Sequence, residues 1–287
     1  MSKLILLLFF AVQNAFAQLP PIIVPSQPEK EELPLYELGV GLGGTYSPAY
    51  PGSDENNFWL LPYPYAVYRG EVFRSDKEGT RARVVHDRFY EFSISSGGGL
   101  PSRSDKLEAR RGMPDLEWLG MIGPAIDLYL TRNKSFGTVK FSLPIRAAFS
   151  TNFKSGHRRG FSTEPLLIYS FPKFLSRDFE FDLILATDFA DKKFMGYFYE
   201  VPSEYATATR PVYSAKAGYL QSSLTFTCSY WIPKTDIRIS PFVTYATLNG
   251  ATNEASPLLR STSNLSASLL FTWEFKKSEK NVSNETF

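Results

Sequence analysis

The chain has 287 residues, 31 of them basic and 29 acidic, and 15% of the residues are aromatic. This near-neutral charge, with the basic residues scattered, gives no reason to expect nucleic acid as a partner. A single cysteine, Cys228, excludes intramolecular disulfides and Cys-rich metal sites, and two histidines leave little material for a histidine-based metal centre. We therefore expect neither a metal nor a cofactor.

The first 17 residues, Met1 to Ala17, have the three parts of a secretory signal peptide. Lys3 is followed by an apolar run, and small residues precede the expected cleavage between Ala17 and Gln18. Residues 18–34 contain five prolines, which exclude a helix and favour an extended periplasmic leader. No later stretch approaches 18 consecutive apolar residues, so we expect no transmembrane helix.

From residue 35 onward, apolar and polar residues alternate with period two over stretches longer than ten residues, as in residues 139–150 and 264–275. A tilted membrane-spanning strand needs about 9–11 residues, which is longer than a usual strand of a globular sheet. The pattern predicts an all-β fold, an antiparallel transmembrane β-barrel of about twelve strands over residues 35–275, with ten to fourteen strands as alternatives. A polar C-terminal tail, residues 276–287, follows. A secreted soluble sandwich is the alternative fold.

Loop lengths favour the barrel. The expected connections alternate between short ones, such as 132–135 and 232–235, and long ones, such as 99–115, 151–159 and 191–212. Outer-membrane barrels have short periplasmic turns and longer external loops. The apolar face of each strand is then expected to meet lipid and the polar face to line the interior. On this basis an arginine should be tolerated at Thr225 but not at Leu224.

Several motifs resemble the MipA/OmpV family of Gram-negative outer-membrane proteins, most densely over residues 36–126. They are Tyr46-Ser47-Pro48-Ala49-Tyr50-Pro51-Gly52-Ser53-Asp54, Leu61-Pro62-Tyr63-Pro64-Tyr65, Phe73-Arg74-Ser75-Asp76, Gly97-Gly98-Gly99-Leu100-Pro101-Ser102 and Arg110-Arg111-Gly112-Met113-Pro114-Asp115. The resemblance implies a barrel in the outer membrane. It also implies a scaffold between a lytic transglycosylase and a murein synthase, or an adhesin or porin-like protein. The family has no catalytic motif.

Five basic residues are candidates for contact with lipopolysaccharide phosphates in external loops: Arg110, Arg111, His157, Arg158 and Arg159. The alternative for Arg110 and Arg111 is an internal ion pair with Asp54, Asp105 or Asp115. The alternative for His157, Arg158 and Arg159 is simple solvation, which we prefer to catalysis.

Aromatic residues supply two further predictions. Trp59, Trp118, Trp231 and Trp273 lie near strand ends and suit aromatic girdles at both interfaces, with a core role as the alternative. Phe275 closes the last alternating strand and is the candidate signal for the barrel assembly machinery, with Phe287 as the alternative. Gly39, Gly41 and Gly43 share one strand face, where a plug, a loop or the leader can pack closely inside the lumen.

Three functions remain open from the sequence. The first is a non-enzymatic scaffold that meets murein enzymes in the periplasm. The others are a porin-like small-solute channel and a surface adhesin or lipopolysaccharide-contacting protein. An enzyme is the least favoured, because His86 and His157 are expected on opposite rims and no catalytic residue set is apparent.

Overall fold

A computed structural model describes residues 32–69, 73–76, 79–82, 89–133, 137–171 and 179–283. The signal peptide expected at residues 1–17, most of the leader, His86 and Phe287 lie outside these ranges. Within them, no helix is long and apolar enough to cross a membrane.

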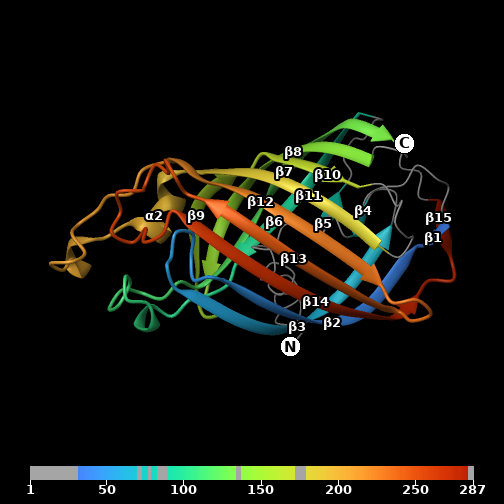
Figure 1. The fold of residues 1–287 in the computed structure, drawn as a ribbon, viewed down its shortest axis with the longest axis horizontal. Coiled ribbons are helices and arrows are strands. Elements are labelled where there is room, and N and C mark those ends of the chain that lie inside the picture. The colour runs from blue at the N-terminus through green and yellow to red at the C-terminus, as the bar shows by residue number, and fades with distance from the viewer. Residues whose placement is uncertain are drawn as a thin grey trace.

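One antiparallel sheet forms the body of the molecule, with strands oblique to the long axis (Figure 1). Its strands are β2 (Tyr36–Pro48), β3 (Asn56–Arg69), β4 (Phe73–Asp76), β5 (Gly79–Ala82), β6 (Tyr90–Gly99), β7 (Trp118–Asn133), β8 (Gly137–Thr151), β9 (Gly156–Thr163), β10 (Leu166–Ser170), β11 (Phe179–Ala190), β12 (Gly218–Trp231), β13 (Ile237–Thr247) and β14 (Ser263–Lys277). Twelve of them follow the order β5-β4-β3-β2-β14-β13-β12-β11-β10-β8-β7-β6.

The remaining strand, β9, lies beyond the end of β10 and pairs with the same two neighbours, β8 and β11. β9 and β10 therefore share one position, and the predicted number of twelve strand positions is confirmed. β5 and β6, at the two ends of the order, contact each other, so the sheet curls round into a barrel. The all-β antiparallel fold expected from the alternation is confirmed.

The two faces of the sheet have the polarity that lipid requires. On β12, Leu224 is 42% exposed, whereas the next residue, Thr225, is 3% exposed and shares a hydrogen bond of 2.8 Å with Thr244. On β14, Phe271 is exposed and Thr272 is buried. A soluble protein would show the reverse, because water favours polar outer faces, whereas a bilayer favours apolar ones. The face assignment from the sequence is confirmed.

The interior of the barrel is filled by side chains. Most of the charged strand residues expected on the polar face are buried: Glu37, Glu91, Asp127, Lys140, Arg146, Glu180, Asp182, Arg238 and Glu274. Glu164, also expected there, is partly buried, and Lys216 is exposed because β12 starts only at Gly218. Some are paired, with 2.6 Å between Arg146 Nη1 and Glu164 Oε2. Two apolar clusters also face inward, one of Leu166, Ile168, Ile184 and Ala186, the other of Phe242 and Leu270. Salt bridges and apolar contacts together make this interior a core.

The glycines of β2 make room for part of that core. A Cβ atom on Gly41 would lie 2.1 Å from Cζ of Tyr63, so the tyrosine ring lies directly over the glycine. The Tyr63 hydroxyl then reaches Thr272 Oγ1 at 2.5 Å, on the strand beyond β2. What packs closely on this glycine face is therefore a side chain of the neighbouring strand.

Long connections gather at one end of the barrel, here called the loop end, on the left of Figure 1. The connection after β11 was expected to be a loop, but it contains α2 (Lys192–Tyr199) and the short 3-10 helix η2 (Ser203–Tyr205). β12 starts at Gly218 rather than at residue 213.

Short turns, such as residues 232–236, mark the opposite end, here called the turn end. β14 continues two residues past Phe275, and Lys277 Nζ lies 2.7 Å from Asp236 Oδ1. β1 (Glu32–Pro34) and β15 (Asn281–Ser283) then pair antiparallel at this end (Figure 1). The end of the expected leader thus meets part of the expected tail.

Candidate functional site

Four connections at the loop end pack into one folded unit, here called the loop cap: residues 49–55, 100–117, 191–217 and 248–262. Side chains from all four form a single apolar cluster that includes Tyr50, Leu107, Leu116, Phe194, Met195, Phe198, Tyr199, Val201 and Leu258. Hydrogen bonds from tyrosine hydroxyls to backbone carbonyls also link these connections. The hydroxyl of Tyr50 donates to Leu258 O at 2.7 Å, and that of Tyr199 donates to Pro51 O at 2.9 Å. The expected external loops are therefore a structured domain over the barrel mouth.

Helix α2 is fixed over β9 by its first turn. Asp191 is the N-cap, and its carboxylate accepts a hydrogen bond of 2.8 Å from Phe194 N. The same carboxylate lies against Gly160, where a Cβ atom would be 2.1 Å from Oδ1 and where φ is +108°. Only glycine suits this backbone conformation and this close approach. The helix is thereby held against β9, which places its apolar face in the loop cap.

Arg110 lies inside the loop cap, not on its surface. Its side chain is buried, and the guanidinium donates to Phe198 O at 3.0 Å, to Pro114 O at 3.3 Å and to Ser104 Oγ at 3.3 Å. Burial lowers the pKa of Arg110. A side chain buried in this way cannot reach lipopolysaccharide, which argues against that interpretation of Arg110. The expected alternative partner Asp115 instead accepts from Ser104 N at 2.6 Å.

Arg210 is a second internal clamp that the sequence analysis did not single out. It donates to Ala109 O at 2.9 Å, to Arg111 O at 3.1 Å and to Tyr205 O at 2.7 Å. It thus joins the connection after β6 to the one after α2. No local pattern distinguishes Arg210 from a surface arginine, since two of its three acceptors, Ala109 O and Arg111 O, are backbone atoms about 100 residues away in the chain.

The tyrosines of the loop cap are held in their neutral form. Burial raises the pKa of Tyr50 to about 12, against the opposing positive charge of Arg110. Burial likewise raises the pKa of Tyr197 to about 12, and that of Tyr199 well above its ordinary value. These groups therefore act as hydrogen-bond donors within the cap.

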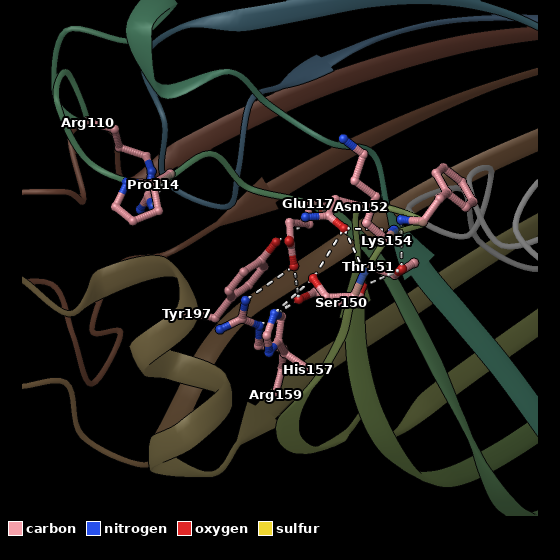
Figure 2. A network of polar contacts seen from close by, with 12 residues as sticks. Arg110, Pro114, Glu117, Ser150, Thr151, Asn152, Lys154, His157, Arg159 and Tyr197 are labelled. Carbon is pink, nitrogen blue, oxygen red and sulfur yellow. Dashed lines mark hydrogen bonds and ion pairs between the residues drawn. The ribbon is translucent and has the colours of Figure 1, made fainter.

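Arg159 also points inward, into a polar network that joins β8, β9 and α2 (Figure 2). Its Nε donates to Ser150 Oγ at 2.7 Å, and its Nη2 lies 3.4 Å from Glu117 Oε2. Ser150 donates to the same carboxylate at 2.6 Å, and the guanidinium lies 4.5 Å from the centre of the Tyr197 ring. The network ties the helix to the barrel wall, so Arg159 is a structural residue rather than a surface contact.

The other three candidate basic residues remain on the surface. Arg111, His157 and Arg158 are all exposed. The guanidinium of Arg158 lies 4.6 Å from the centre of the Phe161 ring. The structure therefore separates two pairs of adjacent arginines: Arg110 is buried beside the exposed Arg111, and Arg159 is partly buried beside the exposed Arg158.

Two of the four tryptophans expected in the aromatic girdles face the barrel interior instead. Trp59 pairs with Thr45 and Trp231 pairs with Arg238. Cross-strand partners share a face, and both partners are buried in the interior, so these two rings face inward and not toward lipid. Trp273 is 54% exposed at the turn end. The girdle stays a prediction for Trp118 and Trp273 only.

The fold resembles several solved outer-membrane proteins at low sequence identity. A bacterial polysaccharide outer-membrane secretin is 8% identical, with 84% of this chain and 99% of that chain covered and a TM-score of 0.38. The NanC porin is 10% identical, with 82% of this chain and 100% of that chain covered and a TM-score of 0.37. The CymD monoaromatic hydrocarbon channel is 11% identical, with 93% of this chain and 94% of that chain covered and a TM-score of 0.38. No curated protein sequence matches the chain.

A family model gives the assignment that the motifs of the first half suggested. The model described as "MltA-interacting protein MipA" matches residues 40–275, from β2 to the end of the apolar alternation in β14. Because this match covers most of the chain, the protein belongs to the MipA family of outer-membrane proteins.

Proposed function

We propose that the protein is a non-enzymatic scaffold of the outer membrane that binds murein enzymes on its periplasmic side. The family description, "MltA-interacting protein", supports a partner of the MltA kind, and a murein synthase is the second expected partner. The proposal includes delivery by the signal peptide, with cleavage between Ala17 and Gln18, and recognition of Phe275 by the barrel assembly machinery.

The observation that carries the scaffold over the porin-like channel is the packed interior. Ile168, Ile184, Phe242 and Leu270 face inward and are all less than 5% exposed. A water-filled channel requires an open, polar lumen, which porins obtain with more strands. The loop cap adds a second barrier over the mouth. Both features suit a barrel that serves as an anchor.

The turn end offers the surface for a periplasmic partner, since short turns of outer-membrane barrels face the periplasm. Leu35 N donates to Lys280 O at 2.8 Å and Ser278 N donates to Tyr36 O at 2.9 Å, so the β1–β15 ribbon is attached directly to the barrel wall. In the described part of the chain this ribbon has two strands, and each presents one edge. Such an edge accepts an added strand from another protein.

Deletion of residues 278–287 tests the proposal, because it removes β15 but leaves the β14 ladder intact. We expect the full-length barrel to capture a purified MltA-type transglycosylase and the deleted barrel to lose this capture. Replacement of the loop-end residues 152–155 by glycines is the matched control and should capture normally. Heat-modifiable gel mobility confirms that each variant is folded.

Two results would contradict the proposal. One is equal capture by the deleted and full-length barrels, and the other is no capture by the full-length protein. Conductance steps above leak in planar bilayers would separately contradict the argument from the packed interior.

A further inference from the structure

The β8–β9 hairpin at the loop end carries a surface that the loop cap does not use. Residues 151–163 contain no acidic residue. Arg159 is engaged by Ser150 and Glu117, and the other basic residues of the hairpin, Lys154, His157 and Arg158, are exposed. Three phenylalanines lie on the same hairpin, and together with these three basic residues they form what is here called the hairpin patch: Phe149, Phe153, Phe161, Lys154, His157 and Arg158.

The aromatic half of the hairpin patch is exposed although it is apolar. Phe149, Phe153 and Phe161 are 46%, 48% and 44% exposed. Phe149 is the residue paired with Arg158, and the Arg158 guanidinium lies over the Phe161 ring at 4.6 Å. One cation is therefore flanked by two exposed rings, an arrangement that favours an amphipathic ligand with an anionic group beside an apolar one.

Hydrogen bonds at the tip of the hairpin fix the backbone of the third phenylalanine, Phe153, with its ring exposed. Phe153 has a φ of +67°, which is costly for a bulky residue. The turn is fixed because Phe153 N donates to Thr151 Oγ1 at 2.9 Å and Asn152 Oδ1 accepts from Lys154 N at 3.0 Å. The centre of the Phe153 ring lies 6.1 Å from that of the Trp118 ring, and 48% of Phe153 stays exposed.

The hairpin patch lies where the membrane-facing surface ends. Ile145, four residues before Phe149 on β8, is 55% exposed and continues the lipid-facing row toward the bilayer. β8 ends at Thr151, so Phe153 lies in the connection at the loop end. Aromatic residues at the end of a membrane strand lie among lipid headgroups, and arginine forms bidentate hydrogen bonds with phosphate. The patch thus places Arg158 level with Phe149, its cross-strand partner, and on the loop-end side of Phe161.

We propose that the hairpin patch binds the phosphate group of lipopolysaccharide in the outer leaflet, with Arg158 on the phosphate and the rings of Phe149 and Phe161 against the acyl chains. Lys154 and His157 add positive charge around the same headgroup. This inference rests on the outer-membrane location of the protein but not on any periplasmic partner.

Titration of the detergent-solubilised full-length protein with lipopolysaccharide tests the inference. Trp118 is a local reporter, because its ring contacts that of Phe153. Arg158→Gln should weaken lipopolysaccharide binding by about tenfold or more, the loss expected for one charge-assisted contact. The matched control is Arg103→Gln, which removes another exposed arginine of the same end, one already paired with Asp105. It should bind as the unmodified protein does.

Three results would overturn the proposal. They are unchanged binding by Arg158→Gln, equal binding of dephosphorylated lipopolysaccharide, and full competition by inorganic phosphate, which would indicate a free-anion site. Phe161→Ala provides a second measurement and should weaken binding of lipopolysaccharide more than that of inorganic phosphate. Deletion of residues 278–287 should leave all of these values unchanged, so failure of this site and failure of the scaffold proposal are distinguishable.

Discussion

Replacement of Arg110 by alanine should open the loop cap. The guanidinium donates to two backbone carbonyls, Phe198 O at 3.0 Å and Pro114 O at 3.3 Å, from two different connections. Pro114 O keeps a second donor, Ser104 Oγ at 2.7 Å, so Phe198 O is the acceptor that loses its side-chain donor. A buried acceptor left without a donor costs about 1–3 kcal/mol, so the opening free energy of the cap should fall by about 1–3 kcal/mol. Even the lower value corresponds to a roughly fivefold rise in the rate of hydrogen exchange.

Arg111 provides the control for this experiment, because it is adjacent in sequence but exposed. Arg111→Ala should change the opening free energy by less than about 0.5 kcal/mol. Arg110→Lys should lower the opening free energy by an intermediate amount, since an ammonium group cannot reproduce the planar set of N–H donors of a guanidinium. Hydrogen exchange with mass spectrometry over residues 103–116 and 192–202 measures all three variants. Equal exchange in Arg110→Ala and Arg111→Ala would refute the reasoning.

Three further predictions concern the barrel and the loop cap. Gly41→Ala should destabilise the barrel by about 1–3 kcal/mol, because its Cβ atom would overlap the Tyr63 ring. Gly44→Ala is the control, since the atom nearest to its Cβ would be 3.8 Å away. The urea midpoint of the heat-modifiable band measures both variants and should change little in Gly44→Ala. The pKa of Tyr50 is raised from 10.0 to about 12, so its stabilisation of the folded cap is complete below about pH 10 and is lost as the pH rises through about 12. Tyr50→Phe should reduce that alkaline loss in hydrogen exchange, and an unchanged profile would contradict the assignment. Leu224→Arg should cost about 2–4 kcal/mol on the lipid face. Thr225→Arg should also destabilise the barrel, by about 1–3 kcal/mol in urea unfolding, because the buried position has no room for it. This last point corrects the expectation from the sequence that an interior position tolerates arginine.

The barrel was predictable because its information is local. Residues such as Leu224 and Thr225 alternate along one strand, and each responds to the solvent on its own side of the sheet, lipid outside and side chains inside. Loop length is equally local, since a short connection is compatible only with a tight turn between neighbouring strands. The sequence therefore sufficed for the fold class, the in–out assignment and the twelve strand positions.

Helix α2 was missed because its sequence, KKFMGYFY, has no strong helical signal of its own. It depends on Asp191 as N-cap and on Gly160, which lies on a different strand and allows the helix to approach. Tertiary packing in the loop cap then stabilises a segment too short to be helical alone.

The fate of the arginines was decided only by the tertiary structure. Arg110 and Arg111, like Arg158 and Arg159, are identical neighbours with no local difference in chemistry. One member of each pair meets an acceptor supplied from elsewhere in the chain, Phe198 O for Arg110 and Glu117 for Arg159. Arg110 is thereby buried and Arg159 partly buried. Sequence periodicity determined which way most strand residues of this protein face, because that choice depends on the immediate solvent. Trp59 and Trp231, expected at the lipid interface, face inward instead. Which loop residues are buried depends on partners brought together by folding, and only the assembled cap decided it.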